Sequence, residues 1–584
     1  MHNARVCGIT GFWSFGGGNA DAMREVAGGM ANRLVHRGPD GAGVFVDAEA
    51  GLALGFRRLA IIDLSSAGAQ PMTSASGRYV IIFNGEIYNH LRLRARLEAE
   101  HAAPDWRGHS DTEVMLACIE AWGLERAVEQ FIGMFAFALW DAREKTLSLV
   151  RDRAGVKPLY FALTDKAVLF ASELKALTAH PAFDRTIDPL AAKLYAQYHC
   201  VPAPKSIYLA ARKLLPGSIL TIAGPDKVEG KRYWNAAEVW KRSLASRVEM
   251  REDDAVAALD ELLGDSVALR MISDVPLGVF LSGGVDSSLV AALMQRNASG
   301  PIHTFTIGFE DPRFDEARFG REVASHLGSN HEELYVRAAD ALALVPDLPR
   351  IYDEPFADSS ALPTYLVSRL ARHTATVALS GDGGDELFAG YHHHFLGARL
   401  QRRVRTVPKF ARPIVGRMLR AIPRTRALGQ GMIDDDQRPI EQIMFLDFTS
   451  YLPDDILTKV DRASMAVSLE VRTPFLDHRV IELAWSLPLS LKIRDDRGKW
   501  IVRKLLRRYL PDALVDREKQ GFGVPLAEWL RGPLRPWAEA LLAKVGDMPF
   551  DAAQVRELWR RHLAGENQQA SLWTVLMYEA WLQA

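Results

Sequence analysis

Two short stretches of this 584-residue sequence carry residue types that could do chemistry. The first is LSGGVDSS, from Leu281 to Ser288, which lies between an apolar strand-like run, PLGVFL, and a helical pattern, SSLVAALMQ. Glycines there would let backbone N–H groups approach a phosphate, and the N-terminus of the following helix adds its positive dipole end. The sequence therefore predicts a phosphate-binding loop at this place.

The order of residues in this loop limits the phosphate chemistry that we expect. No lysine follows the second glycine, so the GxxxxGK[ST] pattern of kinase-type loops is absent and γ-phosphate transfer is not favoured. The order SGGxDSS instead resembles the pyrophosphate-binding loop of ATP pyrophosphatases, which split ATP between its α and β phosphates. A tight strand-to-helix turn alone would explain the two glycines but not the polar residues around them, which are Ser282, Asp286, Ser287 and Ser288.

The second stretch is TATVALSGDGGDELFAGY, Thr374 to Tyr391, where another apolar strand ends in a glycine-rich turn. It carries three carboxylates, Asp382, Asp385 and Glu386. Three carboxylates beside a phosphate site would repel the ligand unless a divalent cation lies between them, so we expect Mg²⁺ there. Asp286 would reach the same metal from the first loop. A solvated acidic turn is the alternative interpretation, and it suits one carboxylate better than three.

A lone cysteine stands in the first strand-like segment, V-C-G-I-T-G-F. The three cysteines of the chain, Cys7, Cys118 and Cys200, are too few and too scattered for a disulfide framework or a zinc site. This usage points to a reducing compartment, and we expect the cytoplasm. Read alone, Cys7 would be an inert thiol.

The elements that must position these residues fall into two regions. From Val6 to about Leu177, short strand-like runs alternate with glycine-rich turns around one helical pattern, which is typical of a β-rich α+β domain. From Arg251 onward helices alternate with single apolar strands, which favours a doubly wound parallel sheet, and beyond Gly390 the pattern is mostly helical. The predicted division is a first domain at 7–215, a linker at 216–250 that pairs a strand or two, and a second domain at 251–584.

Length and composition fit a water-soluble protein with small ligands. The chain exceeds the roughly 250–300 residues at which a single core stops growing, and 48% hydrophobic with 24% charged residues is ordinary for folded proteins. A formal charge of −1 argues against a non-specific nucleic-acid binder. No stretch approaches the ~20 apolar residues of a membrane span, and no export signal is visible.

The motifs together resemble those of one family. Two further segments, TKVDRASMAVSLEVRTPFLDH and REKQGFGVPL, join the two loops in resembling the C-terminal half of the asparagine synthetase family. The N-terminal half is similar to the class II glutaminase domain of its glutamine-hydrolysing members through C-G-I-T-G, HRGPDG, RRLAIIDLS, FNGEIYN, SDTE and RDRAGVKPLYF, which stand in that order. The resemblance covers about Cys7 to Trp581. It implies an αββα N-terminal-nucleophile sandwich followed by an α/β ATP-pyrophosphatase domain with a helical C-terminal part.

The resemblance makes Cys7 the nucleophile that attacks the side-chain amide of glutamine. A thiol of pKa about 8.5 needs a nearby base that is not much stronger, and a free α-amino group, of pKa about 8, is such a base. By the same match, the Asn84 amide and the Gly85 N–H stabilise the oxyanion, Arg58 binds the carboxylate of glutamine, and Asp111 binds its ammonium. The other glutamine-binding residues implied are Glu86, Ala60, Ile61 and Ile62.

The leader MHNARV departs from the family pattern, because an amide-blocked Cys7 has no α-amine. In a first explanation, translation starts at Val6 from a GTG codon, and methionine removal exposes Cys7. In a second, the leader is a propeptide that the protein cuts itself. In a third, the leader stays and the enzyme depends on free ammonia. We favour the first.

For the C-terminal half, the resemblance implies that ATP activates a carboxylate as its adenylate. A lysine such as Lys519 could neutralise the charge that grows on the departing pyrophosphate. Asp382 falls at a position that the family links to formation of the intermediate, and Asp286 and Asp385 are expected to hold Mg²⁺ through pyrophosphate. The ATP-binding residues implied are Leu281, Ser282, Gly283, Gly284, Asp286, Ser287, Ser288, Ile307, Ser380, Gly381 and Lys519.

The expected function is a glutamine-dependent asparagine synthetase, in which ammonia passes through a channel between the domains. ATP, aspartate, glutamine and water would give asparagine, glutamate, AMP and pyrophosphate through β-aspartyl-AMP. One alternative is the same chemistry on the carboxylate of a peptide, a sugar acid or a surface polymer. A catalytically dead regulatory protein is the alternative from another class, although the ATP and glutamine motifs are intact. The expected partners are these small molecules, with no nucleic acid and no membrane span, and a homodimer is left open.

Two other features have ordinary interpretations. The run His392–His394 could suggest a metal, but three adjacent histidines cannot all face one ion on a regular element, so a loop or a solvated helix is favoured. The basic stretch 399–427 could bind an acidic partner or a membrane surface, but its prolines break any long amphipathic helix.

Overall fold

The computed structural model describes residues 7–247, 250–311, 313, 315–395, 438–516, 523–546 and 549–584. The leader, the basic stretch 399–427 and Lys519 lie outside these residues, so the predictions for them stay predictions. Within the described part of the chain, no helix is long and apolar enough to cross a membrane.

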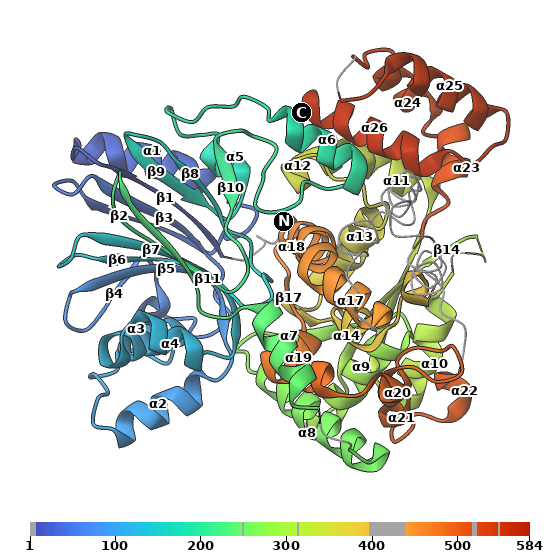
Figure 1. The fold of residues 1–584 in the computed structure, drawn as a ribbon, viewed down its shortest axis with the longest axis horizontal. Coiled ribbons are helices and arrows are strands. Elements are labelled where there is room, and N and C mark those ends of the chain that lie inside the picture. The colour runs from blue at the N-terminus through green and yellow to red at the C-terminus, as the bar shows by residue number, and fades with distance from the viewer. Residues whose placement is uncertain are drawn as a thin grey trace, which may run out of the picture.

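Two antiparallel sheets form the N-terminal half (Figure 1). The first has the order β10-β8-β9-β1-β3-β2 and consists of β1 (Gly8–Ser14), β2 (Gly41–Asp47), β3 (Leu52–Arg58), β8 (Tyr160–Leu163), β9 (Ala167–Ala171) and β10 (Ala211–Lys213). The second has the order β12-β11-β7-β6-β5-β4 and consists of β4 (Met72–Thr73), β5 (Tyr79–Ile87), β6 (Gly133–Asp141), β7 (Thr146–Arg151), β11 (Ser218–Gly224) and β12 (Lys227–Arg232). Part of the predicted linker, residues 218–232, thus supplies two strands to this sheet.

The sheets pack face to face because their central strands turn apolar side chains toward each other and bury them in a shared core. In β1, Ile9 and Trp13 point to one side and join the core between the sheets, whereas Phe12 points to the other side. There α1 (Ala20–Asn32) covers the first sheet, while α2 (His90–Ala99), α3 (Asp111–Trp122) and α4 (Leu124–Gln130) lie on the second. Figure 1 shows the resulting layers, from α1 through both sheets to α3 and α4. The predicted αββα sandwich is confirmed.

A five-stranded parallel sheet organises the C-terminal half, as predicted. Its order is β15-β14-β13-β16-β17, with β13 (Leu277–Phe280), β14 (His303–Phe309), β15 (Asn330–Val336), β16 (Val377–Leu379) and β17 (Glu470–Arg472). Helices cover both faces: α8 (Glu252–Arg270), α9 (Val285–Asn297), α10 (Ala317–Leu327) and α21 (Trp500–Leu506) on one, and α13 (Ala361–Arg372) and α18 (Leu457–Met465) on the other.

The strand order explains where a ligand can bind. From β13 the chain first adds β14 and β15 on one side and later adds β16 and β17 on the other. Loops that leave the carboxyl ends of β13 and β16 therefore diverge at a switch point, and a crevice opens between them. Both glycine-rich loops of the sequence follow these two strands.

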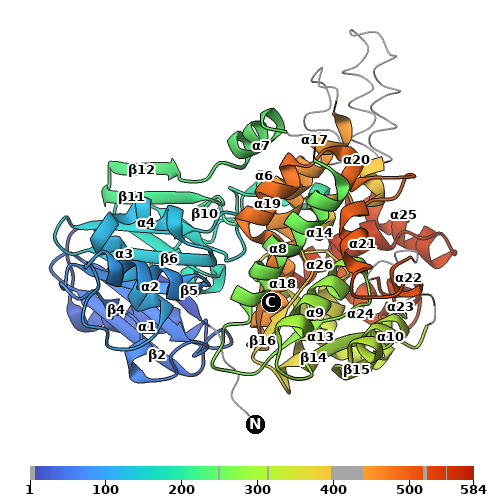
Figure 2. The ribbon, with the colours of Figure 1, turned by 90° about the horizontal axis from the view of Figure 1, so that it is seen from below.

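The remaining helices connect the halves and close the C-terminal end. Figure 2 shows α7 (Ala236–Ala245) leading from β12 toward the C-terminal half. The others are α5 (Leu174–Leu177), α6 (Pro189–Tyr198), α11 (Ala338–Leu344), α12 (Leu348–Tyr352), α14 (Gly384–Phe388), α17 (Pro439–Leu446), α19 (His478–Ser486), α20 (Leu489–Lys492), α22 (Asp512–Val515), α23 (Leu526–Arg531), α24 (Arg535–Leu542), α25 (Ala552–Leu563) and α26 (Gln569–Leu582).

Candidate active sites

A pocket in the N-terminal half gathers most of the residues predicted to bind glutamine. It holds about 400 Å³ of empty space, including the part open to solvent. Its lining consists of Cys7, Arg58, Leu59, Ile61, Ile62, Gly68, Gln70, Phe83, Gly85, Glu86, Ser110, Asp111, Thr112 and Glu470. Ala60 and Asn84 are buried next to this lining, and the Ala60 N–H donates to Asp40 at 3.2 Å. Glu470, from the C-terminal half, is a lining residue that the sequence analysis missed.

Cys7 lies directly before β1, with its thiol at the pocket. The Sγ atom accepts a hydrogen bond from the Leu59 N–H at 3.2 Å and lies 3.5 Å from the Leu59 carbonyl. Desolvation raises the pKa of the thiol to about 12, and the carboxylates of Glu470 and Glu86 add to this effect. The thiol therefore needs a base that takes its proton before the sulfur can act as a nucleophile.

Asn84 and Gly85 lie next to each other on β5. Asn84 is 1% exposed, yet neither polar atom of its side chain has a hydrogen-bond partner among the described residues. Leaving a buried amide without partners costs about 1–3 kcal/mol, which points to a ligand that completes it. Gly85 has φ +147°, and a Cβ there would lie 2.0 Å from the Met134 carbonyl oxygen, so no other residue fits.

The charged residues of the pocket separate into a cationic and an anionic end. Arg58 donates to the carbonyls of Ser65, at 2.8 Å, and Asp63. Asp111, at the start of α3, accepts from the Ile87 N–H at 2.8 Å. Burial raises the pKa of Glu86 well above its usual value, with Asp111 contributing, and burial also raises the pKa of Asp111. Two buried carboxylates of this kind favour a bound cation such as an ammonium group.

The loop after β13 has the form of an anion cradle. Gly283 has φ +69°, and Gly284 directly precedes α9. The Ser282 hydroxyl accepts from the Gly284 N–H at 3.2 Å and lies 3.1 Å from the Ser287 hydroxyl. Ser288 is buried, and its hydroxyl has no partner among the described residues. The helix N-terminus and these hydroxyls suit a phosphate.

The loops after β13 and β16 touch each other. A Cβ on Gly381 would lie 2.9 Å from the Cβ of Asp286. On the strand side, the Leu281 N–H donates to the Phe305 carbonyl at 2.9 Å, and Ile307 lies buried in β14. The structure thus brings together the predicted residues of both loops at the switch point.

Lys499 is a residue of this site that the sequence analysis missed. Its ammonium group is buried and forms ion pairs with Asp286 and, at 2.7 Å, with Asp385. Burial disfavours the charge, but the two carboxylates outweigh it and raise the pKa of Lys499 above its usual value. Lys499 has φ +62°, and a Cβ on the preceding Gly498 would lie 1.9 Å from the Ala389 carbonyl oxygen. The Gly-Lys pair before an apolar helical pattern was the available signal.

The three carboxylates of the second loop have different hydrogen-bond and ion-pair partners. Asp385 pairs with Lys499, whereas Asp382 accepts from the Ser380 hydroxyl at 2.7 Å, and burial raises its pKa. Glu386 is buried and accepts from the Tyr391 hydroxyl at 2.7 Å. The reason is local: Asp385 and Glu386 begin the short helix α14, so consecutive side chains diverge.

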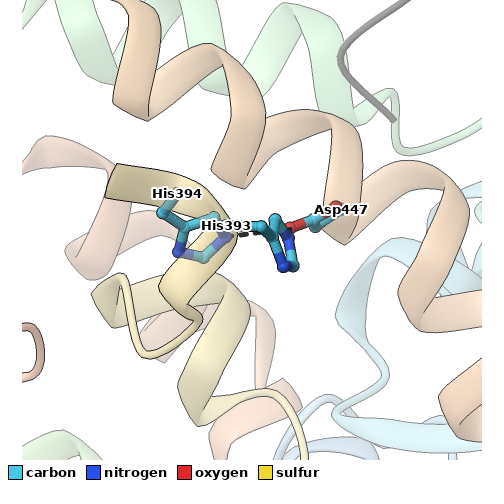
Figure 3. A group of neighbouring side chains, drawn as sticks. All are labelled: His393, His394 and Asp447. Atoms are coloured by element: carbon cyan, nitrogen blue, oxygen red, sulfur yellow. Dashed lines mark hydrogen bonds and ion pairs between the residues drawn. The ribbon is translucent and has the colours of Figure 1, made fainter. Parts of the chain in front are cut away.

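The histidine run is not simply a solvated segment. His392 is exposed, but both following imidazoles reach the Asp447 carboxylate, His393 at 2.5 Å and His394 at 2.8 Å (Figure 3). These three side chains could also hold a metal ion. However, Nδ1 of the buried His394 has no partner among the described residues, whereas metal-bound histidines almost always donate their second N–H. We therefore interpret the group as a hydrogen-bonded clamp.

Comparison with known proteins matches each half of the chain to a known domain. The asparagine synthase family matches residues 258–583, and the glutamine amidotransferase domain matches residues 6–234. Glutamine-hydrolyzing asparagine synthetase 1 of Bacillus subtilis (strain 168) is 32% identical over 94% of this chain and 92% of its own. Glutamine-hydrolyzing asparagine synthetase 3 of the same organism is 31% identical over 88% of this chain and 87% of its own. The glutamine-hydrolyzing asparagine synthetase of Triphysaria versicolor is 30% identical over 86% of this chain and 75% of its own.

The fold and the sites thus define a glutamine-dependent amidotransferase whose second half is an ATP-dependent amidoligase. The chain belongs to the asparagine synthase family.

Proposed function

We propose that this protein makes asparagine from aspartate, with glutamine as nitrogen donor and ATP as the activating substrate. The observation that carries the proposal is the pairing of two sites in one chain: the cysteine pocket with its cationic and anionic ends, and the two loops at the switch point. The full-length relatives named above share both halves.

In the first reaction, the Cys7 thiolate attacks the side-chain carbonyl carbon of glutamine. The Asn84 amide and the Gly85 N–H stabilise the oxyanion, because preformed donors in a buried site cost no reorganisation. Ammonia leaves, and water then hydrolyses the glutamyl thioester to glutamate. Arg58 holds the carboxylate of glutamine, and Asp111 with Glu86 holds its ammonium.

The α-amine of Cys7 is the proposed base, since the raised pKa of the thiol requires one close to the sulfur. This needs a chain whose residues 1–6 have been removed or never translated. The N-terminal sequence of protein made from its native gene tests that requirement directly.

In the second half, the aspartate side-chain carboxylate attacks the α-phosphate of ATP and releases pyrophosphate. Ammonia then displaces AMP from β-aspartyl-AMP. The Ser282–Ser288 loop cradles the phosphates, and Lys499 offsets the charge that grows on pyrophosphate. Asp286 and Asp385 would hold Mg²⁺, which supplies further positive charge; the donor set fits, because both carboxylates reach one cationic atom, Nζ of Lys499.

A second, narrow hollow lies at the boundary between the halves, where ammonia would have to pass; its roughly 270 Å³ of space includes the part open to solvent. It lies between the glutaminase half and α18. Its lining consists of Val156, Lys157, Leu457, Val460, Asp461, Ser464, Val471 and Thr473.

The test is asparagine formation by the purified protein from aspartate and ATP, with either glutamine or ammonium as donor. We expect both donors to work, and Cys7→Ala to abolish only the reaction with glutamine. If aspartate causes no pyrophosphate release while another carboxylate does, the proposed acceptor is wrong and the amidation of a peptide, sugar acid or polymer takes its place.

A further inference from the structure

The glutamine pocket is completed by a strand of the other half of the protein. Strand β17, at the edge of the C-terminal sheet, carries Glu470 and Arg472, and both side chains are buried at the interface. Glu470 lines the pocket itself. Neither residue belongs to the glutamine-binding set that the N-terminal motifs imply.

The guanidinium of Arg472 is fixed by atoms of the C-terminal half. Its Nη1 donates to the carbonyls of Arg270, at 2.9 Å, and Ile272, at 2.7 Å, while Nε donates to Glu470 at 2.9 Å. The remaining nitrogen, Nη2, lies 3.4 Å from the Glu86 carboxylate of the pocket. Arg472 is 0% exposed, and the three hydrogen bonds of Nη1 and Nε fix its guanidinium so that Nη2 faces the Glu86 carboxylate.

The charges at the anionic end of the pocket explain why a buried arginine faces Glu86. Burial raises the pKa of Glu86 and Asp111, so positive charges nearby are needed to keep them ionised; with Glu470 they would carry three negative charges, against two positive ones on Arg472 and Lys157, which lies 3.7 Å from Glu470. The group is one positive charge short, and the ammonium of glutamine supplies it. Without Arg472 the imbalance would double, and a buried carboxylate that is left uncompensated tends to take up a proton. A protonated Glu86 would no longer attract the ammonium.

We propose that Arg472 is a positioning residue for glutamine: it holds the Glu86 carboxylate at the anionic end of the pocket, so that the C-terminal half completes the glutaminase site. The inference rests on the proposed function of the pocket. Arg472 also ties this site to the ATP loop, because its carbonyl accepts the Ser380 N–H at 2.9 Å.

The main variants are Arg472→Met and Arg472→Lys in the full chain. Since Arg472→Met removes the buried ion pair with Glu86 and Arg472→Lys weakens it, we expect the KM for glutamine to rise about 10-fold to 100-fold in Arg472→Met, and less in Arg472→Lys, with kcat within about threefold. Ammonia-dependent synthesis should stay within about twofold. The matched control is Arg153→Lys, another buried arginine held by backbone carbonyls, away from the pocket, which should leave the KM unchanged.

A double-mutant cycle separates positioning from a general structural effect. If Arg472 acts through Glu86, the effects of Arg472→Met and Glu86→Gln on the KM do not add. Additive effects, or a parallel loss of ammonia-dependent synthesis, would overturn the proposal. Should Arg472→Met fail to fold, Arg472→Lys and the cycle built on it decide the question.

Titration of glutamine into Cys7→Ala, with and without Arg472→Lys, distinguishes this inference from the proposed function. Weaker binding in the double variant supports the role of Arg472 even if hydrolysis is never seen. No glutamine binding by Cys7→Ala alone, together with no hydrolysis by the unmodified protein, would instead refute the proposed function of the pocket.

Discussion

Replacing Lys499 by methionine tests the proposed role of the ATP site most directly. The substitution keeps a long apolar stem but removes the ammonium group between Asp286 and Asp385. Those two carboxylates would then face the phosphates without their lysine. Removing one preorganised charge-stabilising group from an active site typically costs about 2.7–4 kcal/mol of transition-state stabilisation, a factor of about 100 to 1,000 in rate.

The assay is aspartate-dependent pyrophosphate release, measured with ammonium so that the glutaminase half has no part in it. We expect Lys499→Met to lower this rate at least 100-fold, while glutamine hydrolysis in the absence of ATP stays near its normal value. The control is Lys504→Met, on the same helix α21, where a half-exposed lysine pairs with Glu252 at 2.8 Å. Lys504→Met should leave both rates unchanged.

A rate of pyrophosphate release within threefold of normal in Lys499→Met would refute the reasoning. The lysine would then serve only to pair two carboxylates. In that case, thermal unfolding should show the loss, because breaking a buried ion pair leaves uncompensated charge.

Three further outcomes are expected. A chain that starts at Cys7 should hydrolyse glutamine at a rate that levels off near pH 8, where its α-amine loses its proton, whereas a chain that keeps its leader should show at most a small residual rate that still rises near pH 9, because burial raises the pKa of the Cys7 thiol and no α-amine is present to take its proton; initial rates from pH 6 to 10 check this. Asn84→Ala should lower kcat for glutamine hydrolysis about 100-fold without lowering the melting temperature, because the amide has no hydrogen bond to lose within the described structure. Asp447→Ala should reduce the free energy of unfolding by about 2–4 kcal/mol, because it leaves the imidazoles of His393 and His394 without their acceptor. A chelator should leave the melting temperature of the unmodified protein unchanged. A lower melting temperature with the chelator would mean that these three side chains hold a metal ion.

Local patterns in the sequence were enough to predict the loops and their sheets. Leu281–Ser288 follows an apolar run of strand length and precedes a helical repeat, and both assignments depend only on neighbouring residues. The N-terminal sandwich was predicted from alternating runs together with the family resemblance. Residues 218–232 were predicted only as a linker that pairs a strand or two, because the prolines and glycines around them obscure the pattern; in the structure β11 pairs with β7, and β12 pairs with β11 as the edge strand.

Side-chain direction is what local patterns could not supply. Glu386 and Asp385 are adjacent, but one helical step turns them to different partners, Tyr391 and Lys499. Lys499 itself enters the site from a segment that is 213 residues away from Asp286 along the chain. Charge complementarity between such distant residues leaves no periodic trace in a single sequence, so the Gly-Lys pair at Lys499 marks the start of a helix but does not by itself connect the lysine with Asp286 and Asp385.

Local sequence patterns also do not show which residues meet across the boundary between the two halves, and here two such residues reach the glutamine pocket. The sequence separates a glutaminase from a synthetase, yet Glu470 and Arg472 of the second half stand in the wall of the first pocket. The same strand β17 pairs with β16, which leads into the ATP loop, so it contacts both the glutamine pocket and the sheet that carries the ATP site. A division of the chain near residue 250 would therefore leave the glutamine site incomplete, and the two reactions are physically joined at β17.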